Sequence, residues 1–421
     1  MNQTRRQFLR TSTHGVLLWT AAQSAPSFAF NSVPYKTIDH FFVFMKINGG
    51  WDTSLCLDPW IETRRPDPKD MFIEYTPDQL ISTDTEIIFG PAALPLKAYA
   101  KDSCVINGIF LSPTDSGHGA AMNYMTSGST KATAPDLCVE MDIALNQNLP
   151  YGVVHNSFAR LGNRKTLISA TQDLKNILSE GSISSELAKI YDKESLRNAP
   201  SAFLQAIRTL LNSSATDQLY IESHNRISAS TEIQKTAALI AASFLAGASQ
   251  FANFDFISSN LDTHGDHPKN HMQGLQKVLG EATEIFDLFK SIPFGTSGSS
   301  LYDHTTFLLT SEFSRTPFLN GANGKDHNPM SNSALLVGKG LPKGKVFGGT
   351  RLIPRSLSAQ GEPYHIAFPI DYNTGKPMKS RQGSSHLLRP ENLMKSILNL
   401  MNVPLERVQS ISSKTPALPG F

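Results

Sequence analysis

The chain has 421 residues but few cysteines and almost no net charge. Its three cysteines, Cys56, Cys104 and Cys138, lack Cys-x-x-Cys spacing, which argues against a zinc knuckle and a disulfide framework. We therefore expect buried thiols, with at most one pair oxidised. Lysine plus arginine number 38 and aspartate plus glutamate 36, a balance without the basic footprint that binds nucleic acid or anionic lipid.

Long apolar runs and glycine-rich nucleotide motifs are also missing. The chain is 40% hydrophobic and 18% charged, which is too apolar for a disordered chain and too polar for a protein with several membrane spans. The lack of cysteine ligands and of a dinucleotide glycine signature argues against an electron-transfer or redox enzyme. The composition therefore predicts a globular protein with a large core.

The N-terminus resembles a twin-arginine export signal. Residues 4–10 contain paired arginines followed by Phe-Leu, and a short apolar stretch follows at 15–22. That stretch is too short to span a bilayer, so we expect no stable membrane span in the mature protein. Small residues allow cleavage after Ser24 or Ala29, which predicts a signal peptide over residues 1–29, export by the twin-arginine machinery and a periplasmic mature protein.

Twin-arginine substrates, as a class, cross the membrane already folded, often because a metal or cofactor is loaded in the cytoplasm. Folding in that reducing compartment agrees with unpaired cysteines. Removal of residues 1–29 takes away three arginines and no acidic residue, so the mature chain is close to electrically neutral.

Strands alternate with helices over most of the remaining chain. Residues 41–47 form a continuous apolar, β-rich run that ends in Asn-Gly-Gly-Trp-Asp, as expected of a buried parallel strand that opens into a loop. Further strands are predicted at 103–110, 167–170, 254–258, 305–310 and 334–337. Helices are predicted at 119–126, 136–146, 184–193, 200–213, 231–251, 272–290 and 390–401.

This alternation predicts an α/β fold: a single large domain over residues 30–421, with a mostly parallel central sheet flanked by helices on both faces. Residues 338–385 are rich in glycine and proline and should form loops or a small antiparallel excursion at the sheet edge. We expect His271 to begin a helix and to cap it or face solvent.

Acidic residues and histidines concentrate at predicted strand ends. They are Asp52 after the first strand, Asp262 and His264 after 254–258, Glu312 after 305–310, and Asp326 and His327 one loop later. Hard divalent cations prefer carboxylates, zinc accepts imidazole, and ligands of open α/β sheets collect at strand ends. The sequence therefore predicts a divalent metal site with one ion, or two about 4 Å apart, and Zn, Mn, Mg and Ca all remain open.

Four motifs resemble the DUF1501 family, exported bacterial proteins placed near the sulfatase and alkaline phosphatase superfamily. They occur in the family's order at residues 48–53, 262–266, 310–317 and 325–327. The resemblance runs from about residue 38 to the helix start at 389–393. It implies an alkaline phosphatase-like fold, metal ligands at strand ends and a small anionic ester as substrate.

The resemblance also implies particular ligands. Asp52 matches the metal-binding Asp after the first strand, Asp262 and His264 match a later pair, and His327 matches the final histidine. The penultimate ligand pair of the superfamily is Asp-His directly after a strand. Here that slot holds Glu312 followed by Phe, so either a ligand is lost or Asp326 and His327 are themselves the pair.

The nucleophile departs from the superfamily pattern. Sulfatases and phosphatases place a Cys, Ser or Thr at the start of the helix that corresponds to residues 114–128, where the sulfatase spacing arrives at His118. Ser116 reaches a metal only if the loop bulges. His118 is instead a metal ligand, a general acid or base, a nucleophile, or a helix cap without catalysis. Arg315 either binds an oxyanion bidentately or pairs with a nearby carboxylate.

Two functions follow from these residues. The first is a metal-dependent periplasmic hydrolase of phosphate or sulfate esters. The second is a non-catalytic metal-binding or assembly protein of the cell envelope that retains the hydrolase fold. Buried carboxylates without a cation or partner are costly, which favours the first.

Overall fold

The structure is a computed structural model that describes residues 38–112, 114, 117–146, 149–157, 159–162, 168–180, 216–256, 260–295, 298–359, 361–378 and 386–421. Three predictions lie outside these residues. They are the signal peptide at 1–29, the helices at 184–193 and 200–213, and the candidate nucleophile Ser116.

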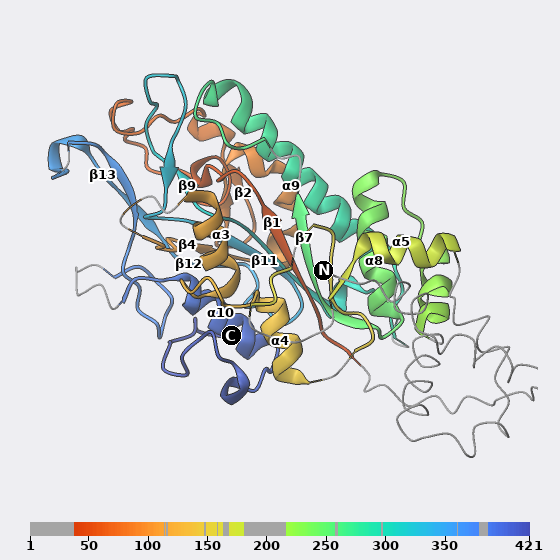
Figure 1. Cartoon of the computed structure of the whole chain (residues 1–421). Coiled ribbons are helices and arrows are strands. Elements are labelled where there is room, and N and C mark those ends of the chain that lie inside the picture. The colour runs from red at the N-terminus through yellow and green to blue at the C-terminus, as the bar shows by residue number, and fades with distance from the viewer. Residues whose placement is uncertain are drawn as a thin grey trace, which may run out of the picture.

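A mostly parallel sheet crosses the middle of the molecule (Figure 1). Within the described chain it has eight strands, in the order β12 (Lys345–Gly348), β4 (Ser103–Asn107), β11 (Ser333–Gly338), β8 (Thr305–Ser311), β1 (Phe41–Ile47), β7 (Ser249–Phe256), β5 (Gly152–His155) and β6 (Ile168–Ala170). Only β11 runs against its neighbours, β4 and β8, among these strands. The predicted fold class is therefore confirmed.

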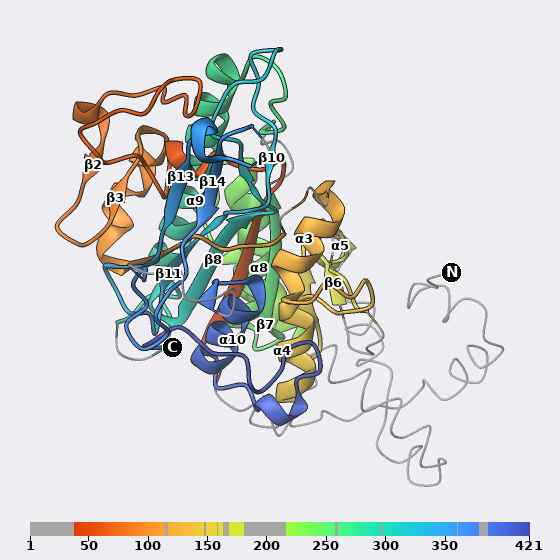
Figure 2. The same cartoon turned by 90° about the vertical axis from the view of Figure 1, so that its left-hand side faces the viewer.

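Helices cover both faces of the sheet because β1 is apolar on both sides. Its alternate side chains enter two separate hydrophobic cores, as the period of two in a strand requires. One core is completed by the 3₁₀ helix η3 (Pro91–Asp102), α5 (Thr171–Glu180), α8 (Glu232–Leu245) and α9 (His267–Ser291). The other is completed by α3 (Gly117–Ser127), α4 (Leu137–Leu145) and α10 (Pro390–Leu400), which Figure 2 shows on one side of the sheet.

Two helix boundaries differ from the sequence-based expectation. The helix predicted at 231–251 ends at Leu245, because Gly247 adopts a left-handed φ of 63° and β7 begins at Ser249. The helix predicted from 272 begins at His267, with Pro268 in its first turn. This earlier start buries His271 completely, so its predicted exposure was wrong.

The region 338–385 contains the predicted antiparallel excursion. Strands β13 (Thr350–Ile353) and β14 (Tyr364–Ala367) pair antiparallel and project from one end of the sheet (Figure 1). Two further antiparallel pairs were not predicted. They are β2 (Ile81–Ser82) with β3 (Ile88–Phe89), and β9 (Ser314–Arg315) with β10 (His327–Asn328).

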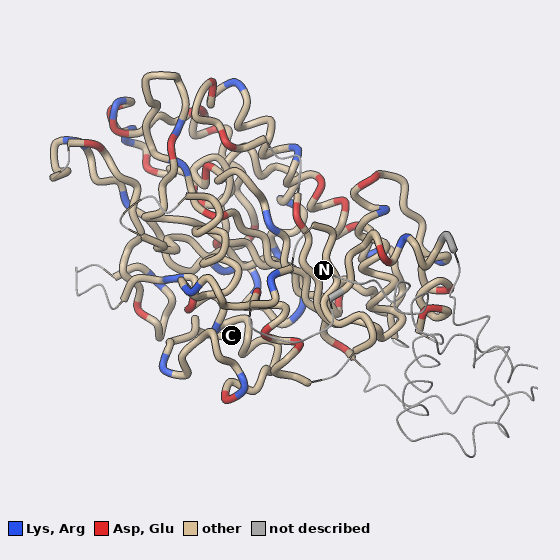
Figure 3. The backbone as a smooth tube through the Cα atoms, viewed as in Figure 1, with Lys and Arg blue, Asp and Glu red and all other residues tan. Residues whose placement is uncertain are grey.

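The remaining global expectations concern charge, thiols and membranes. Lysine and arginine are interspersed with aspartate and glutamate along the described backbone (Figure 3). The three cysteines are free and buried, as predicted. No helix among the residues that the structure describes is long and apolar enough to cross a bilayer.

Candidate metal centre

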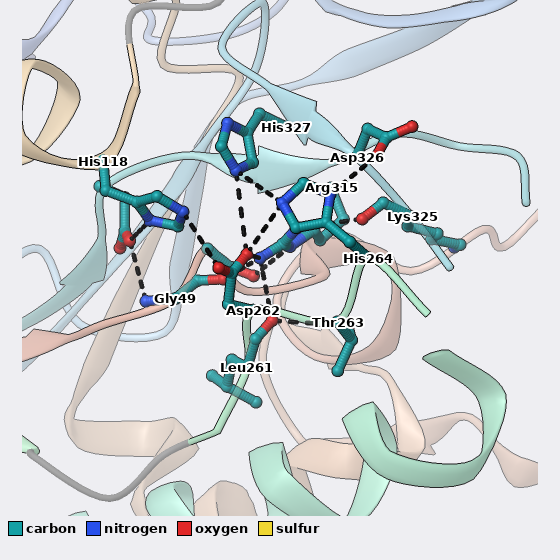
Figure 4. Close-up of polar contacts among 12 residues, drawn as sticks. Gly49, His118, Leu261, Asp262, Thr263, His264, Arg315, Lys325, Asp326 and His327 are labelled. Carbon is teal, nitrogen blue, oxygen red and sulfur yellow. Dashed lines mark hydrogen bonds and ion pairs between the residues drawn. The ribbon is translucent and has the colours of Figure 1, made fainter. Parts of the chain in front are cut away.

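Residues from five separate stretches of chain meet beyond the carboxyl ends of β1, β7 and β8 (Figure 4). The side chains come from the first turn of α3 (His118), the loop after β7 (Asp262 and His264), the end of β8 with β9 (Glu312 and Arg315), and the segment that enters β10 (Asp326 and His327), and the glycines after β1 (Gly49 and Gly50) contribute backbone groups. The strand ends of a parallel sheet converge in this way, so the fold itself brings together residues that are far apart in sequence.

Four of these residues form the surface cluster, which consists of His118, Asp262, His264 and His327. One donor atom from each lies within 4.8 Å of all the others. His264 Nε2 lies 3.1 Å from both Asp262 Oδ1 and His327 Nε2. His118 Nε2 approaches Asp262 Oδ2 at 3.4 Å. Three imidazoles and one carboxylate form a donor set that suits zinc.

Glu312 orients the ring of His118. The carboxylate is buried, and its Oε1 lies 2.6 Å from His118 Nδ1 and accepts the Gly49 N–H at 2.8 Å. Burial opposes ionisation of Glu312, but hydrogen bonds from His118, Ser311 and Gly49 outweigh it and lower its pKa. The ionised carboxylate accepts the Nδ1–H of His118 and so raises the pKa of that imidazole. In the neutral ring, the Nε2 lone pair then faces the cluster.

Asp326 orients His264 in the same way. Its Oδ1 lies 2.7 Å from His264 Nδ1, and Asn320 donates to the same oxygen at 3.1 Å. The Nδ1–H of His264 is thereby directed at a carboxylate while Nε2 faces Asp262. A carboxylate behind an imidazole is the usual arrangement around histidine ligands of metals.

Arg315 holds Asp262 from inside the protein. Its Nη2 donates to Asp262 Oδ1 at 2.6 Å, and this contact lowers the carboxyl pKa against the opposing effect of partial burial. The guanidinium also donates to the backbone carbonyls of four loop residues, Gly49, Gly50, Leu261 and Lys325. The side chain is 0% exposed, so the structure places Arg315 as a buried carboxylate partner rather than facing an external oxyanion.

Two consecutive glycines allow these loops to approach. Gly49 has a φ of 104°, and a Cβ there would lie 2.8 Å from the backbone nitrogen of Asp262. Gly50 has a φ of 69°, and a Cβ there would collide with the ring of Phe313. Phe313 in turn packs on the ring of His327, with ring centroids 4.2 Å apart. The Gly-Gly sequence therefore lets the Asp262 loop and the aromatic wall of the cluster lie against β1.

The surface cluster is open to solvent on one side. The side chains of His118, Asp262 and His264 are 39%, 49% and 46% exposed, whereas His327 is 11% exposed. Structural zinc sites are closed, whereas catalytic sites keep a position open to water or substrate. If the cluster holds a metal, its exposure matches an open site rather than a closed structural one.

Asp52 belongs to a second group, the buried cluster, which consists of Asp52, Glu74, His267, His271 and Lys325. Asp52 Oδ2 accepts the Lys325 ammonium at 2.6 Å and lies 3.2 Å from His267 Nε2. Burial opposes ionisation of Asp52, but Lys325 and His267 hold its pKa well below the ordinary range. The structure thus places Asp52 in an internal ion pair and not among the four donors of the surface cluster.

Most of the surface cluster was predicted from the sequence, but the buried cluster was not. Asp262, His264 and His327 were predicted ligands, and His118 was a possible one. Asp52, Glu312 and Asp326 were also predicted as ligands, but Asp52 lies in the buried cluster and the other two lie behind the imidazoles. Glu74 had no role assigned, His267 was noted only as an Asp-His pair with Asp266, and Lys325 appeared only as part of a motif. The four-residue spacing of His267 and His271, which puts both on one face of α9, is the signal that could have pointed to this cluster.

Solved structures that match this chain include the lipoteichoic acid synthase LtaP from Listeria monocytogenes, which is 9% identical at a TM-score of 0.39, with 96% of this chain and 79% of that chain covered. A protein of the alkaline phosphatase superfamily from Vibrio parahaemolyticus is 11% identical at a TM-score of 0.32, with 83% and 72% covered. No curated protein matches this sequence.

One family model matches part of the chain. It is described as "Protein of unknown function (DUF1501)" and covers residues 161–366. The matched segment carries three members of the surface cluster, Asp262, His264 and His327, whereas Asp52 and His118 lie before it. Over residues 161–366, this chain is therefore similar to the DUF1501 proteins, as its motifs predicted.

Proposed function

We propose that this protein is a metal-dependent hydrolase of phosphate or sulfate esters that acts in the periplasm. The observation that carries the proposal is the convergence of three imidazoles and Asp262 at a solvent-exposed sheet edge. The donor set fits one divalent cation, and imidazole donors favour zinc over magnesium or calcium. When bound there, such a cation polarises an ester oxygen and lowers the pKa of a water molecule.

The residues around the surface cluster prepare it for that cation. Glu312 and Asp326 engage the Nδ1 atoms of two imidazoles and leave their Nε2 lone pairs toward the cluster. Arg315 fixes Asp262 through Oδ1, while Oδ2 faces His118. His118 therefore acts as a ligand in this proposal, and its exposed position beside Asp262 puts it where an ester would enter.

The nucleophile is either water or a protein hydroxyl. Ser116 precedes His118 by two residues and is the hydroxyl that we propose for the second case. Replacement of Ser116 by Ala separates the two cases: turnover is lost if the hydroxyl attacks the ester and is retained if water does. Zinc content should be unchanged in either case.

The main test is metal analysis combined with turnover. Protein purified from periplasm without added chelator or nickel resin should hold about one equivalent of a divalent ion and hydrolyse 4-nitrophenyl phosphate or 4-nitrophenyl sulfate. Asp262→Ala should lose both metal and turnover, whereas His304→Ala, a histidine outside both clusters, should keep both. Wild-type protein with much less than one equivalent of any divalent ion would contradict the proposal.

A second candidate function is a non-catalytic metal-binding or assembly protein of the envelope. The full burial of Arg315 favours it, because the guanidinium beside the cluster is already bound to protein groups and does not face an anionic ester. Stoichiometric metal without turnover on either ester would support this second function.

We also propose that residues 1–29 direct twin-arginine export. Mass spectrometry of the periplasmic protein should find a mature N-terminus at Ala25 or Phe30. Replacement of both Arg5 and Arg6 by Lys should keep the protein in the cytoplasm with its N-terminus intact. Export of this variant at the wild-type level would exclude the twin-arginine route.

A further inference from the structure

Lys325 occupies an oxygen-lined position in the interior. Its side chain is 1% exposed, and its Nζ donates to Asp52 Oδ2 at 2.6 Å and to the Phe72 carbonyl at 3.3 Å. The Glu74 carboxyl also belongs to this group, because its Oε1 lies 3.4 Å from His267 Nε2, which itself approaches Asp52. Two carboxyl groups therefore accompany one ammonium group in a region with little water.

Glu74 remains partly unsatisfied in this arrangement. Its side chain is 8% exposed, and Oε1 has no hydrogen-bond donor among the residues that the structure describes. Burial raises the pKa of Glu74 to about 7, which shows how poorly a second negative charge is balanced there. The buried cluster is thus a place that attracts cations, and the Lys325 ammonium is the cation it holds.

The two histidines of the buried cluster have no lone pair to offer a metal. His271 Nε2 accepts the Asp52 N–H at 2.8 Å, so the neutral ring carries its proton on Nδ1. That Nδ1–H donates to Thr263 Oγ1 at 2.9 Å. The Thr263 hydroxyl proton is then donated to His267 Nδ1 at 2.7 Å, which is much nearer than the alternative acceptor, the Leu261 carbonyl at 3.5 Å. The lone pair of each imidazole is therefore already used.

The same chain of hydrogen bonds fixes the proton of His267. Burial lowers the pKa of His267 to about 4 and that of His271 well below its ordinary value, so both rings are neutral near pH 7. Because Nδ1 of His267 accepts from Thr263, its proton sits on Nε2 and points between Asp52 and Glu74. What remains for a cation is a set of oxygens, the kind of donors that magnesium and manganese prefer.

We infer that Lys325 is a built-in cation that fills an oxygen-lined cation position, so that the protein binds one exchangeable metal ion in the surface cluster and none beside Asp52. This inference rests on the proposed function for the ion in the surface cluster. It decides between the one-metal and two-metal alternatives that the sequence leaves open. While the Lys325 ammonium fills the position beside Asp52, no metal ion can bind there.

The test is to remove the Lys325 ammonium by substitution and to add Mn²⁺, a hard cation. Zinc-loaded Lys325→Ala should bind about one equivalent of Mn²⁺, measured by electron paramagnetic resonance, because Asp52 Oδ2 and the Phe72 carbonyl then lose the ammonium and the Glu74 carboxyl belongs to the same cluster. Zinc-loaded wild type should bind no Mn²⁺ there. The double variant Asp52→Asn/Lys325→Ala is the matched control and should also bind none, because it lacks the central carboxylate.

Three results would overturn the inference. The first is Mn²⁺ bound by zinc-loaded wild type and lost in Asp52→Asn, and the second is folded Lys325→Ala that binds no Mn²⁺. If Lys325→Ala does not fold without metal, recovery of native circular dichroism with Mn²⁺ supports the inference, whereas no recovery is the third contrary result. Failure of the proposed function has a different signature, since wild type would then take up no zinc in the first titration.

Discussion

The surface cluster and the buried cluster both contain aspartate and histidine, and their residues are interleaved in the chain. Asp262 and His264 belong to the first, whereas Thr263 between them binds both histidines of the second. Likewise, Lys325 points inward and His327 belongs to the surface cluster. The burial pattern alternates along residues 261–264, as expected where successive side chains of an extended backbone point to opposite sides.

The two clusters differ in their exposure to solvent and in whether they contain an internal cation, the Lys325 ammonium. At the surface, imidazole Nε2 atoms face the Asp262 carboxylate, and three of the four side chains are 39–49% exposed, so the proposed ion would have access from solvent. In the interior, the cost of an uncompensated charge selects a permanent partner, and the 2.6 Å contact between Lys325 and Asp52 supplies it. Aspartate and histidine therefore form an open candidate metal site at the surface and a charge-paired part of the fold in the interior.

The largest expected effect comes from breaking the buried ion pair. Asp52→Asn should lower the free energy of unfolding by about 3–5 kcal/mol, because it leaves the Lys325 ammonium buried without its partner. Urea denaturation measures this loss, and zinc binding to the folded fraction should be retained. Zinc lost with normal stability would instead show that Asp52 is a ligand.

A second effect concerns the pH dependence of stability. Folding raises the pKa of Glu74 from an ordinary value of 4.5 to about 7, so the protonated carboxyl stabilises the fold at low pH and that stabilisation is lost as the pH rises through 7. Glu74→Gln should therefore be more stable than wild type at about pH 8, by up to about 3 kcal/mol, and close to it at about pH 5.

Urea denaturation at both pH values measures the Glu74 effect. Glu62→Gln, on an exposed loop, is the matched control and should show no such difference. A Glu74→Gln variant that is less stable than wild type at pH 8 would mean that the ionised carboxylate is favourable in the interior.

A third prediction concerns His264, a member of the surface cluster. His264→Ala should weaken zinc binding by at least about 100-fold, because it removes a donor atom and not just a supporting group. The apoprotein should keep its stability to within about 1 kcal/mol, since the side chain is 46% exposed. Isothermal titration and urea denaturation measure the two quantities, and a strongly destabilised apoprotein would contradict the division into two clusters.

The smallest effects are expected for the carboxylates behind the imidazoles. Glu312→Gln should weaken zinc binding by about 10- to 100-fold, and Asp326→Asn by about tenfold or less. The order follows from burial, because Glu312 is 2% exposed and Asp326 is 49% exposed, so water can replace the second more easily. The reverse order would show that the Asp326 contact with His264 dominates.

Much of the fold was readable from the sequence because six of the seven residues of β1 are apolar. A strand buried on both faces requires a parallel sheet with helices on both sides, and the two cores around β1 confirm this. The boundary between α8 and β7 was not readable, because apolar residues occur in α8, on both sides of Gly247 and in β7. The start of α9 was missed for the opposite reason: its first residues, from His267 to His271, lack the apolar periodicity of the rest of the helix, so the burial of His271 was missed with it.

Most residues of the candidate site could be predicted from the sequence, but not which of them belong to the surface cluster and which to the buried cluster. Asp262, His264 and His327 follow strands, and strand ends of parallel sheets meet at one edge. Which side of the loop each residue faces depends on contacts far away in sequence, such as Lys325 with Asp52 or Glu312 with His118. Arg315 carried two open roles for the same reason, since its carbonyl partners come from three different loops.

The sequence alone predicts the layered α/β fold, the near-neutral net charge and the strand ends at which acids and histidines gather. Those properties follow from composition and periodicity, which are local. Only the tertiary structure decided which acid faces water and which is neutralised by a lysine, because burial and charge pairing are set by packing between segments that are distant in the chain.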